Sequence, residues 1–345
     1  MPRPARLGPW VPVGGLCALL LAVSCAAPPP VPRGTTALEG GPSLRGLHAA
    51  PDGTVWAGGS EGTVARSRDH GRSWERLPAP PGGEDLDFRD LHAFSADVAV
   101  LMAAGPGEAS RLFRTEDAGR TWTETWRNRD PAGFLDGIDF WPDGTGLAVG
   151  DPLKGRLMLL RSEDRGRSWQ PLPQQSCPLA VTGEYAFAAS GTSLCCGPDG
   201  LVWLGTGGSA TRILRSEDRG ASWVAVAAPF LSGPGAGVFS VAFADARTGV
   251  AVGGDYLLPE QARGHAAWSD DGGRTWHPVA AEAGPRGYRS CVVRLRDGSW
   301  LAVGPTGSDR SQDDGRSWQP VGGEGWHAAT AATVSGGGGR LGTLR

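Results

Sequence analysis

Residues 161–169 read Arg-Ser-Glu-Asp-Arg-Gly-Arg-Ser-Trp, and the last eight of these residues define a pattern that recurs along the chain. The pattern is Ser or Thr, then Asp two positions later, Gly two positions after that, and finally Ser or Thr followed by Trp. Six copies occur, at Ser67–Trp74, Thr115–Trp122, Ser162–Trp169, Ser216–Trp223, Ser269–Trp276 and Ser311–Trp318. Their first residues lie 42 to 54 positions apart. A near-regular period of this length predicts a repeat architecture.

The chemistry of the repeated octapeptide is that of a turn. A short Asp side chain accepts hydrogen bonds from backbone N–H groups a few residues on, and the hydroxyl residues act in the same way. The Gly supplies a backbone conformation with positive φ, and the Trp buries a large ring beside the next strand. We therefore predict a structural and not a catalytic role for the six aspartates, Asp69, Asp117, Asp164, Asp218, Asp271 and Asp313.

Strand-like segments and turn residues at this period predict propeller blades, with one four-stranded sheet per repeat. The octapeptide resembles the Asp-box, or BNR repeat, found in sialidases, sortilin-type receptors and photosystem II stability and assembly factors. The resemblance covers about residues 43–345. It implies an all-β propeller but leaves function open, because proteins that share this turn differ in their sites.

The blades are expected to open with inner strands at Leu44, Phe88, Leu135, Tyr185, Val238 and Tyr288, and a seventh start follows at Gly325. The chain ends before a seventh octapeptide, so the last blade lacks an outer strand. Thr35–Glu39 can supply it, and a closed ring removes the exposed sheet edges. We predict seven four-stranded blades closed by this N-terminal strand; six blades with a loose tail is the alternative.

Composition supports a folded repeat protein. The 345 residues include 55 Gly and 28 Pro, but the glycines fall at repeated turn positions and 14 Trp supply a core. The net charge of −3 gives no basic surplus of the kind that indicates nucleic-acid binding. We expect a monomer.

The N-terminus has the form of an export signal. Arg3 and Arg6 precede a largely apolar run at 11–23, and small residues lead to Cys25. This resembles a bacterial lipoprotein signal, although Ala22 stands where Leu is usual, and implies removal of residues 1–24, lipidation of Cys25 and anchoring in the bacterial cell envelope. Residues 25–42 would be a proline-rich tether and the closing strand. An ordinary cleaved signal peptide is the alternative.

Four further cysteines, Cys177, Cys195, Cys196 and Cys291, would then lie in a compartment that permits disulfides. A bridge from Cys177 to Cys195 or Cys196 is one option, and the sequence does not choose. No Cys or His cluster predicts a metal, and no cofactor is expected. The run Gly205-x-Gly207-x-x-Ala210 matches a dinucleotide fingerprint, but it leads into an octapeptide and not into the helix that such a site needs, so we interpret it as a turn.

A second resemblance lies between the octapeptides. The segments 88–90, 134–141, 251–256 and 302–309 resemble a bacterial branch of the photosystem II assembly-factor family. Membership would imply a non-catalytic protein that binds a protein or peptide and assists the assembly or stability of a membrane complex.

A sialidase-like glycoside hydrolase is the alternative function. Such enzymes are Asp-box propellers in which three arginines grip the substrate carboxylate, a Tyr–Glu pair acts as nucleophile and an Asp acts as acid/base. Residues of all these types are present, namely Arg45, Arg89, Arg289, Tyr288, Glu184 and Asp136. The Arg-Ile-Pro motif that precedes the first box of those enzymes is absent.

The predicted partner site is the mouth of the central channel, which inner strands line. Aligning the predicted inner strands places Arg45, Arg89, Asp136, Ala186, Phe239, Arg289 and Trp326 at one equivalent position. The arginines would form one arc together with Trp326 and His327, and Asp136, Asp139 and Glu184 would lie opposite. The full set of candidate partner-binding residues is Arg45, Arg89, Asp90, Asp136, Asp139, Phe239, Asp255, Tyr256, Tyr288, Arg289, Trp326 and His327.

Structural roles compete with these assignments. Each arginine could pair with a neighbouring acid such as Asp90 and tie blades together. His48, His92 and Asp139 occupy equivalent places in three successive blades, where packing is favoured over metal binding. A mobile loop is expected at 257–264, beside Tyr256.

Overall fold

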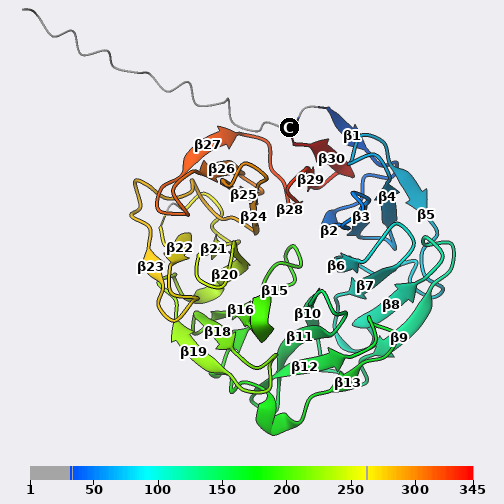
Figure 1. Cartoon of the computed structure of the whole chain (residues 1–345), viewed down its shortest axis with the longest axis horizontal. Coiled ribbons are helices and arrows are strands. Elements are labelled where there is room, and N and C mark those ends of the chain that lie inside the picture. The colour runs from blue at the N-terminus through cyan, green and yellow to red at the C-terminus, as the bar shows by residue number, and fades with distance from the viewer. Residues whose placement is uncertain (1–31, 33, 262, 345) are drawn as a thin grey trace, which may run out of the picture.

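The computed structural model describes residues 32, 34–261 and 263–344, and within them it shows a ring of seven antiparallel sheets (Figure 1). Blades one to three are regular four-stranded sheets with adjacent strands paired in chain order. Their strands are β2 (Leu44–Ala49), β3 (Val55–Gly59), β4 (Val64–Ser67) and β5 (Glu75–Leu77); β6 (Phe88–Ala93), β7 (Ala99–Ala103), β8 (Arg111–Thr115) and β9 (Thr123–Arg127); and β10 (Leu135–Phe140), β11 (Gly146–Leu153), β12 (Arg156–Ser162) and β13 (Gln170–Pro171).

Blades five and six follow the same order. Their strands are β20 (Gly233–Phe243), β21 (Gly249–Asp255), β22 (Ala266–Ser269) and β23 (His277–Pro278), then β24 (Cys291–Arg294), β25 (Trp300–Gly304), β26 (Gly307–Ser311) and β27 (Gln319–Gly322). Blade seven combines the two ends of the described chain: β28 (Ala328–Ala329), β29 (Thr333–Ser335), β30 (Arg340–Thr343) and, outermost, β1 (Thr35–Ala37). The predicted seven blades and their closure by the N-terminal strand are confirmed.

The expected inner strand of blade four is wrong. Blade four is β15 (Leu194–Cys196), β16 (Val202–Gly205), β18 (Arg212–Ser216) and β19 (Val224–Ala227). The apolar segment at Tyr185 instead forms β14 (Glu184–Tyr185), which pairs with β17 (Gly207–Gly208) and extends the sheet of blade five. Two apolar segments compete here, and the one that a short loop joins to β16 takes the inner place, because short connections favour adjacent antiparallel strands.

The octapeptides form the predicted turns. In the third copy, the Asp164 carboxylate accepts the backbone N–H of Ser168 at 3.0 Å and its hydroxyl at 2.6 Å, while Ser162 donates to Asp164 at 2.9 Å. The Ser162 hydroxyl also accepts the N–H of Gly166 at 2.8 Å. The other five copies repeat this network. Hydrogen bonds of this kind lower the pKa of the aspartates, to about 2 at Asp271.

One feature of the turn was not predicted. The residue before the Gly that all six octapeptides share also has a positive φ, for example 68° at Ala118 and 62° at Arg165. Two successive left-handed residues are typical of tight turns between antiparallel strands. Only the fifth copy has a Gly, Gly272, at the first of these two positions.

The core lies between neighbouring sheets, where each blade packs a face on the next. Trp56, Trp203 and Trp300, one each from blades one, four and six, are almost completely buried. Trp203 stacks on Phe243 of blade five, with ring centroids 3.5 Å apart and planes inclined by 10°. Its indole N–H donates to the carbonyl of Gly272 at 2.9 Å. The Trp rings therefore join blades as well as filling them.

No disulfide joins the cysteines that the structure describes: Cys177, Cys195, Cys196 and Cys291 are free thiols. The bridge from Cys177 to Cys195 or Cys196 is therefore not formed. Within the same residues, no helix is both long and apolar enough to cross a bilayer. The signal segment 1–24 and Cys25 lie outside the described residues.

Candidate functional site

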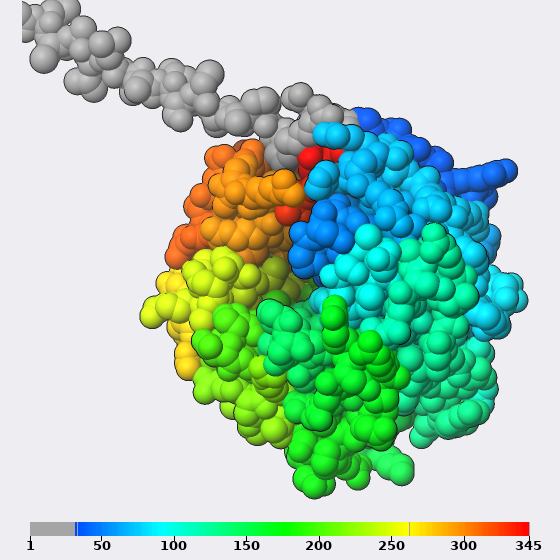
Figure 2. Space-filling view, turned by 45° about the vertical axis from the view of Figure 1, so that its right-hand side comes forward, coloured from blue at the N-terminus to red at the C-terminus, as the bar shows by residue number. Residues whose placement is uncertain are grey.

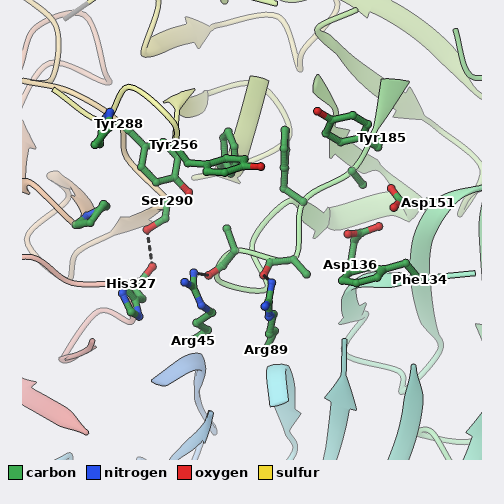
Figure 3. Close-up of a pocket in the computed structure, with 17 residues that line it drawn as sticks. Arg45, Arg89, Phe134, Asp136, Asp151, Tyr185, Tyr256, Tyr288, Ser290 and His327 are labelled. Atoms are coloured by element: carbon green, nitrogen blue, oxygen red, sulfur yellow. Dashed lines mark hydrogen bonds between the residues drawn. The ribbon is translucent and has the colours of Figure 1, made fainter. Parts of the chain in front are cut away.

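A pocket of about 610 Å³ opens on the central axis of the ring, where the space-filling surface is hollowed between blade one and the blades opposite it (Figure 2). Six blades contribute to its wall (Figure 3). The charged, hydroxyl-bearing and aromatic residues that line it include Arg45, Arg89, Asp136, Asp151, Tyr185, Phe187, Phe239, Tyr256, Tyr288, Ser290 and His327. A cavity therefore lies at the mouth of the channel, where the sequence predicts the partner site.

β-Bulges aim side chains into this pocket. In blades one, two, three and five the register between the inner strand and its neighbour shifts by one residue, and the extra residue is Arg45, Arg89, Asp136 or Phe239. A bulge leaves its extra residue out of the regular ladder and redirects its side chain. The four residues predicted to be equivalent in these blades do occupy one structural position.

In blades six and seven the predicted alignment is one residue wrong. The backbone N–H groups of Arg289 and Trp326 bond to Gly253 and Gly304 of the preceding blade, as Leu44 bonds to Gly336. Arg289 and Trp326 therefore match buried Leu44, and the positions that match Arg45 belong to Ser290 and His327. Both of these line the pocket.

The predicted arc of three arginines is consequently wrong. Arg289 is 1% exposed and forms an ion pair with Asp309, its Nε lying 2.7 Å from a carboxylate oxygen. It also donates to the hydroxyl of Thr306 at 2.9 Å. Because the predicted alignment was shifted by one residue, it placed Arg289 in the channel wall, where the structure has Ser290.

The four strands of blade four contribute no residue to the pocket wall. A crossing segment, residues 185–189, takes their place and runs from β14 through the mouth of the channel. Its residues Ala186–Ala189 are buried. Arg45 and Arg89 point toward it, and their Nη1 atoms lie 3.4 Å and 3.5 Å from the carbonyl oxygens of Ala189 and Ala188 (Figure 3). The segment closes the floor of the pocket beside the two arginines.

Arg45 and Arg89 form the cationic side of the pocket. The Nε of Arg89 is 2.7 Å from a carboxylate oxygen of Asp87, whereas among the described residues Arg45 has no acidic partner. Burial and the nearby Arg89 charge lower the pKa of Arg45. Neither arginine pairs with Asp90, whose carboxylate accepts the N–H groups of Leu91 and Ile138 at 2.7 Å and 2.6 Å. The alternative that each arginine pairs with a neighbouring acid therefore holds for Arg89 with Asp87 and for Arg289 with Asp309, but not for Arg45 and not with Asp90.

Two acids lie on the pocket wall next to Arg89. Asp136 is 2% exposed, and in Figure 3 its carboxyl group lies beside that of Asp151, from β11. Burial, followed by the charge of Asp151, raises the pKa of Asp136, and burial raises the pKa of Asp151 to about 6. The sequence analysis did not single out Asp151, which directly follows the strand-like run Leu147-Ala-Val-Gly150.

Aromatic rings form a third side. Phe187 of the crossing segment stacks on Phe239 at 3.7 Å between centroids, and Tyr288 meets Phe239 edge-on at 4.7 Å. Tyr256 stands at the rim and is 48% exposed, followed by exposed Leu257 and Leu258. The pocket thus has a basic, an acidic and an aromatic side. The mobility expected of the loop at 257–264 stays a prediction.

Besides Asp90, Arg289 and Trp326, three further predicted residues lie outside the pocket: Asp139, Asp255 and Glu184. Asp139 accepts the N–H of Cys196 at 2.7 Å, with His92 at 3.5 Å, and Asp255 caps a turn through the N–H of Leu257 at 2.9 Å. Glu184 is bound by Arg212 and Thr206. The sialidase constellation is therefore not assembled, because Glu184 and Arg289 are tied outside the pocket. Within residues 32, 34–261 and 263–344, no group of three or more His, Cys, Asp or Glu side chains could hold a metal ion.

These features define the class: the chain is a seven-bladed β-propeller of BNR/Asp-box repeats, with a polar and aromatic pocket on its axis. The BNR/Asp-box repeat family model matches residues 267–278.

Relatives share the architecture at low identity. YCF48 from Cyanidioschyzon merolae is 16% identical over 90% of this chain and 98% of its own, with a TM-score of 0.62, and a structure of YCF48 bound to D1 peptide is 15% identical over 91% and 95%, with a TM-score of 0.63. A GH74 xyloglucanase from Xanthomonas campestris is 19% identical over 82% of this chain and 47% of its own, with a TM-score of 0.57.

Sequence comparison finds a vacuolar protein sorting/targeting protein 10 from Chaetomium globosum, 34% identical over 121 residues. These residues are 34% of this chain and 7% of that protein, so the chain spans less than a tenth of the length of the curated relatives it matches.

Proposed function

We propose that the protein is a non-catalytic binding protein that receives a carboxylate-bearing peptide segment of a partner protein in the central pocket. The observation that carries this proposal is the pair Arg45 and Arg89, two neighbouring guanidinium groups in the pocket wall, of which Arg45 has no acidic partner among the described residues. Guanidinium groups bind carboxylates through two parallel hydrogen bonds, and a partly desolvated site strengthens them.

The geometry favours an extended ligand over a flat surface contact. The pocket lies on the propeller axis, Ala188 and Ala189 form its floor, and Tyr256 with Leu257 provides an exposed apolar rim. A segment entering the mouth would bury side chains on this rim while its carboxylate reached the arginines. The fold shared with YCF48, one structure of which is bound to D1 peptide, supports a peptide as the kind of ligand.

We further propose that the protein is lipid-anchored in the bacterial cell envelope through Cys25, acts there as a monomer and assists assembly or stability of a membrane complex. Support comes from the small residues before Cys25 and the prolines after it. Several acyl chains hold a protein firmly in a bilayer, since each buried CH₂ contributes about 0.8 kcal/mol. Cys25→Ser protein should lose membrane association; unchanged partitioning would refute the anchor.

The binding proposal is tested with the variant Arg45→Glu/Arg89→Glu. Its melting temperature should match that of the wild type, because both side chains border an open pocket. Affinity capture from membranes, followed by mass spectrometry, should then recover fewer partners than the wild type recovers. Arg76→Glu/Arg120→Glu is the matched control, since both residues lie outside the pocket wall. An identical partner profile from the folded pocket variant would leave the two arginines as structural residues.

Glycoside hydrolysis is the second candidate, favoured by one observation: two carboxyl groups with raised pKa values share a pocket in a fold also adopted by a GH74 xyloglucanase. Acid and base roles in such enzymes come from paired carboxyls with different environments. Xyloglucan oligosaccharides and a fluorogenic sialoside are the direct substrates to assay. Turnover by the wild type that Asp136→Asn abolishes would establish this function in place of the first.

A further inference from the structure

We propose that Asp136 and Asp151 form a cation subsite for a primary ammonium group, so that the pocket recognises a segment carrying a lysine side chain as well as a carboxylate. The inference rests on the proposed peptide-binding function and adds the second charge that the ligand must have. It is carried by the position, burial and incomplete hydrogen bonding of the two carboxyl groups.

The two carboxyl groups are built into the wall, and one oxygen of each lacks a hydrogen-bond partner. Asp136 is the bulge residue of β10, and Asp151 lies on the neighbouring strand β11. The backbone N–H of Asp151 donates to the carbonyl of Phe134 at 3.0 Å. One buried oxygen of each, Oδ2 of Asp136 and Oδ1 of Asp151, has no hydrogen-bond partner among the described residues. Buried polar atoms are normally paired, so these oxygens indicate a missing donor.

The groups around the pair favour a cation. Arg89 of β6 is the basic group whose charge acts on Asp136, and it is already paired with Asp87. The backbone N–H groups of Ala188 and Ala186 donate to Asp136 and Asp151 respectively. Two neighbouring acids with these partners still repel each other, and burial disfavours their ionised forms. A bound cation between them would remove both penalties.

The aromatic neighbours favour an ammonium group in particular. Phe134 lines the pocket beside the acids (Figure 3). Burial raises the phenol pKa of Tyr185, and the nearby charges of Tyr256 and Asp151 raise it further, so this ring also lies near the acids. An ammonium carries three donors, which suits two open carboxyl oxygens, and its charge is also attracted to ring faces. A lysine presents this group on a long apolar stem that the aromatic wall can cover.

The arrangement gives the pocket a polarity. Arg45 and Arg89 border one side and Asp136 and Asp151 another, with the crossing segment between them (Figure 3). A ligand with one charge of each sign satisfies both sides, whereas a purely acidic ligand places its charge beside two carboxylates. Like-charge contacts discriminate against wrong partners, so the acidic pair would exclude segments with several acids.

The experiment uses three small probes that separate the two subsites: n-butylammonium for the acids, butyrate for the arginines and 6-aminohexanoate for both. Binding to the whole protein at neutral pH is followed by the carboxyl carbon signals of ¹³C-labelled aspartate. The acid variant is Asp136→Asn/Asp151→Asn, which preserves shape, and its matched control is Arg45→Gln/Arg89→Gln.

We expect n-butylammonium to bind the wild type and the arginine variant, and to lose roughly tenfold or more in affinity in the acid variant. Binding should also weaken as the pH falls through the pKa of Asp151, about 6, because that carboxylate then loses its charge. If butyrate binds but n-butylammonium does not, or binds the acid variant equally well, the cation subsite is refuted and the proposed function stands. If n-butylammonium binds the acids but butyrate finds no arginine-dependent site, the proposed function fails and the cation subsite stands.

Two further outcomes would overturn the ammonium assignment. Displacement of n-butylammonium by Ca²⁺ at much lower concentration would make the pair a metal site, and sugar release dependent on Asp136 would make it catalytic. Should the acid variant fail to fold, the wild type alone is decisive. Bound n-butylammonium should lower the aspartate pKa values measured from the carboxyl carbons, and unchanged values would refute the subsite.

Discussion

Thr36 of β1 lies opposite Leu341 of β30 in an antiparallel pair, so the two ends of the described chain meet in one sheet (Figure 1). The strand is only three residues long and its side chains are exposed. The strand therefore contributes to the fold through its backbone, which pairs with the outer edge of the last blade. An uncovered edge strand would present unpaired N–H and C=O groups to other chains.

The first prediction tests this closure at Leu38, whose N–H donates to the carbonyl of Gly339 at 2.9 Å. Leu38→Pro removes the donor, whereas the control Leu38→Ala removes only side-chain packing. The proline variant should lose about 0.5–1.5 kcal/mol more unfolding free energy than the alanine variant in a denaturant titration. Equal losses would show that the edge is stabilised by side chains alone.

The second prediction concerns Ala118, which precedes the Gly of the second octapeptide with φ of 68° and is 2% exposed. A left-handed backbone costs a residue with a Cβ about 1–2 kcal/mol. Relief of this cost should offset the lost methyl group, so that Ala118→Gly leaves the unfolding free energy nearly unchanged or higher. Ala57→Gly, at an equally buried position inside β3, should instead destabilise the protein by about 1 kcal/mol or more. Equal destabilisation by both variants would contradict this account of the turn.

The third prediction ranks the octapeptide residues. Trp169 is 3% exposed and meets Phe140 edge-on at 5.4 Å, so Trp169→Ala should cost about 3–5 kcal/mol. Asp164→Ala should cost about 1–3 kcal/mol, because it leaves the turn donors unpaired. Trp223→Ala is the internal comparison and should cost less than Trp169→Ala, since that ring is only half-buried. Thermal or denaturant unfolding gives the order directly, and any binding activity should survive in the folded variants.

Much of the fold could be predicted because the octapeptide encodes local turn chemistry that does not depend on the rest of the chain. Blade number, strand order and the closing strand all follow from its spacing. The inner strand of blade four was predicted wrongly for a physical reason. Tyr185–Phe187 is as apolar as a real inner strand, and only the tertiary contact of β14 with β17 shows that it belongs to the neighbouring sheet.

The site was predicted only in part. Arg45, Arg89 and Asp136 could be placed because the same bulge recurs in their blades. Arg289 could not be placed, because a charged residue is expected to be exposed. In the structure it is buried, and its charge is neutralised by the buried Asp309 on β26. Asp151 was missed because it belongs to a second strand, and nothing in the sequence indicates that β11 runs far enough to reach the pocket.

The fourth prediction concerns the thiols. Burial raises the pKa of Cys177, Cys195, Cys196 and Cys291, to about 12 at Cys195. The thiolate is the reactive form, so alkylation by iodoacetamide at neutral pH should be slow in the folded protein and rapid in denaturant. Mass spectrometry of the peptides counts the labels. A disulfide between two of these cysteines, or rapid labelling of all four before unfolding, would contradict the arrangement of free thiols.

The last prediction uses the acidic pair as a probe of the pocket. Asp136 and Asp151 have folded-state pKa values above the unfolded value of 3.8, so they bind protons more tightly in the native state. Below about pH 3, well under the unfolded pKa of 3.8, both states are protonated and the pair costs nothing. As pH rises toward 6 the unfolded state loses protons first, and the unfolding free energy falls. Above the folded-state pKa values the penalty stays constant.

Replacing the pair with Asp136→Asn/Asp151→Asn should therefore stabilise the protein at pH 7, on the order of 1–3 kcal/mol, and leave it nearly unchanged at about pH 3. Denaturant titrations of both proteins at several pH values give the difference directly. Asp69→Asn is the control of opposite sign: Ser73 hydrogen bonds lower its carboxyl pKa, so this variant should lose stability at pH 7 and lose less at low pH. A difference between wild type and double variant that is constant from pH 4 to 7 would mean that the two carboxyls ionise independently of folding, and that no missing cation is needed in the pocket.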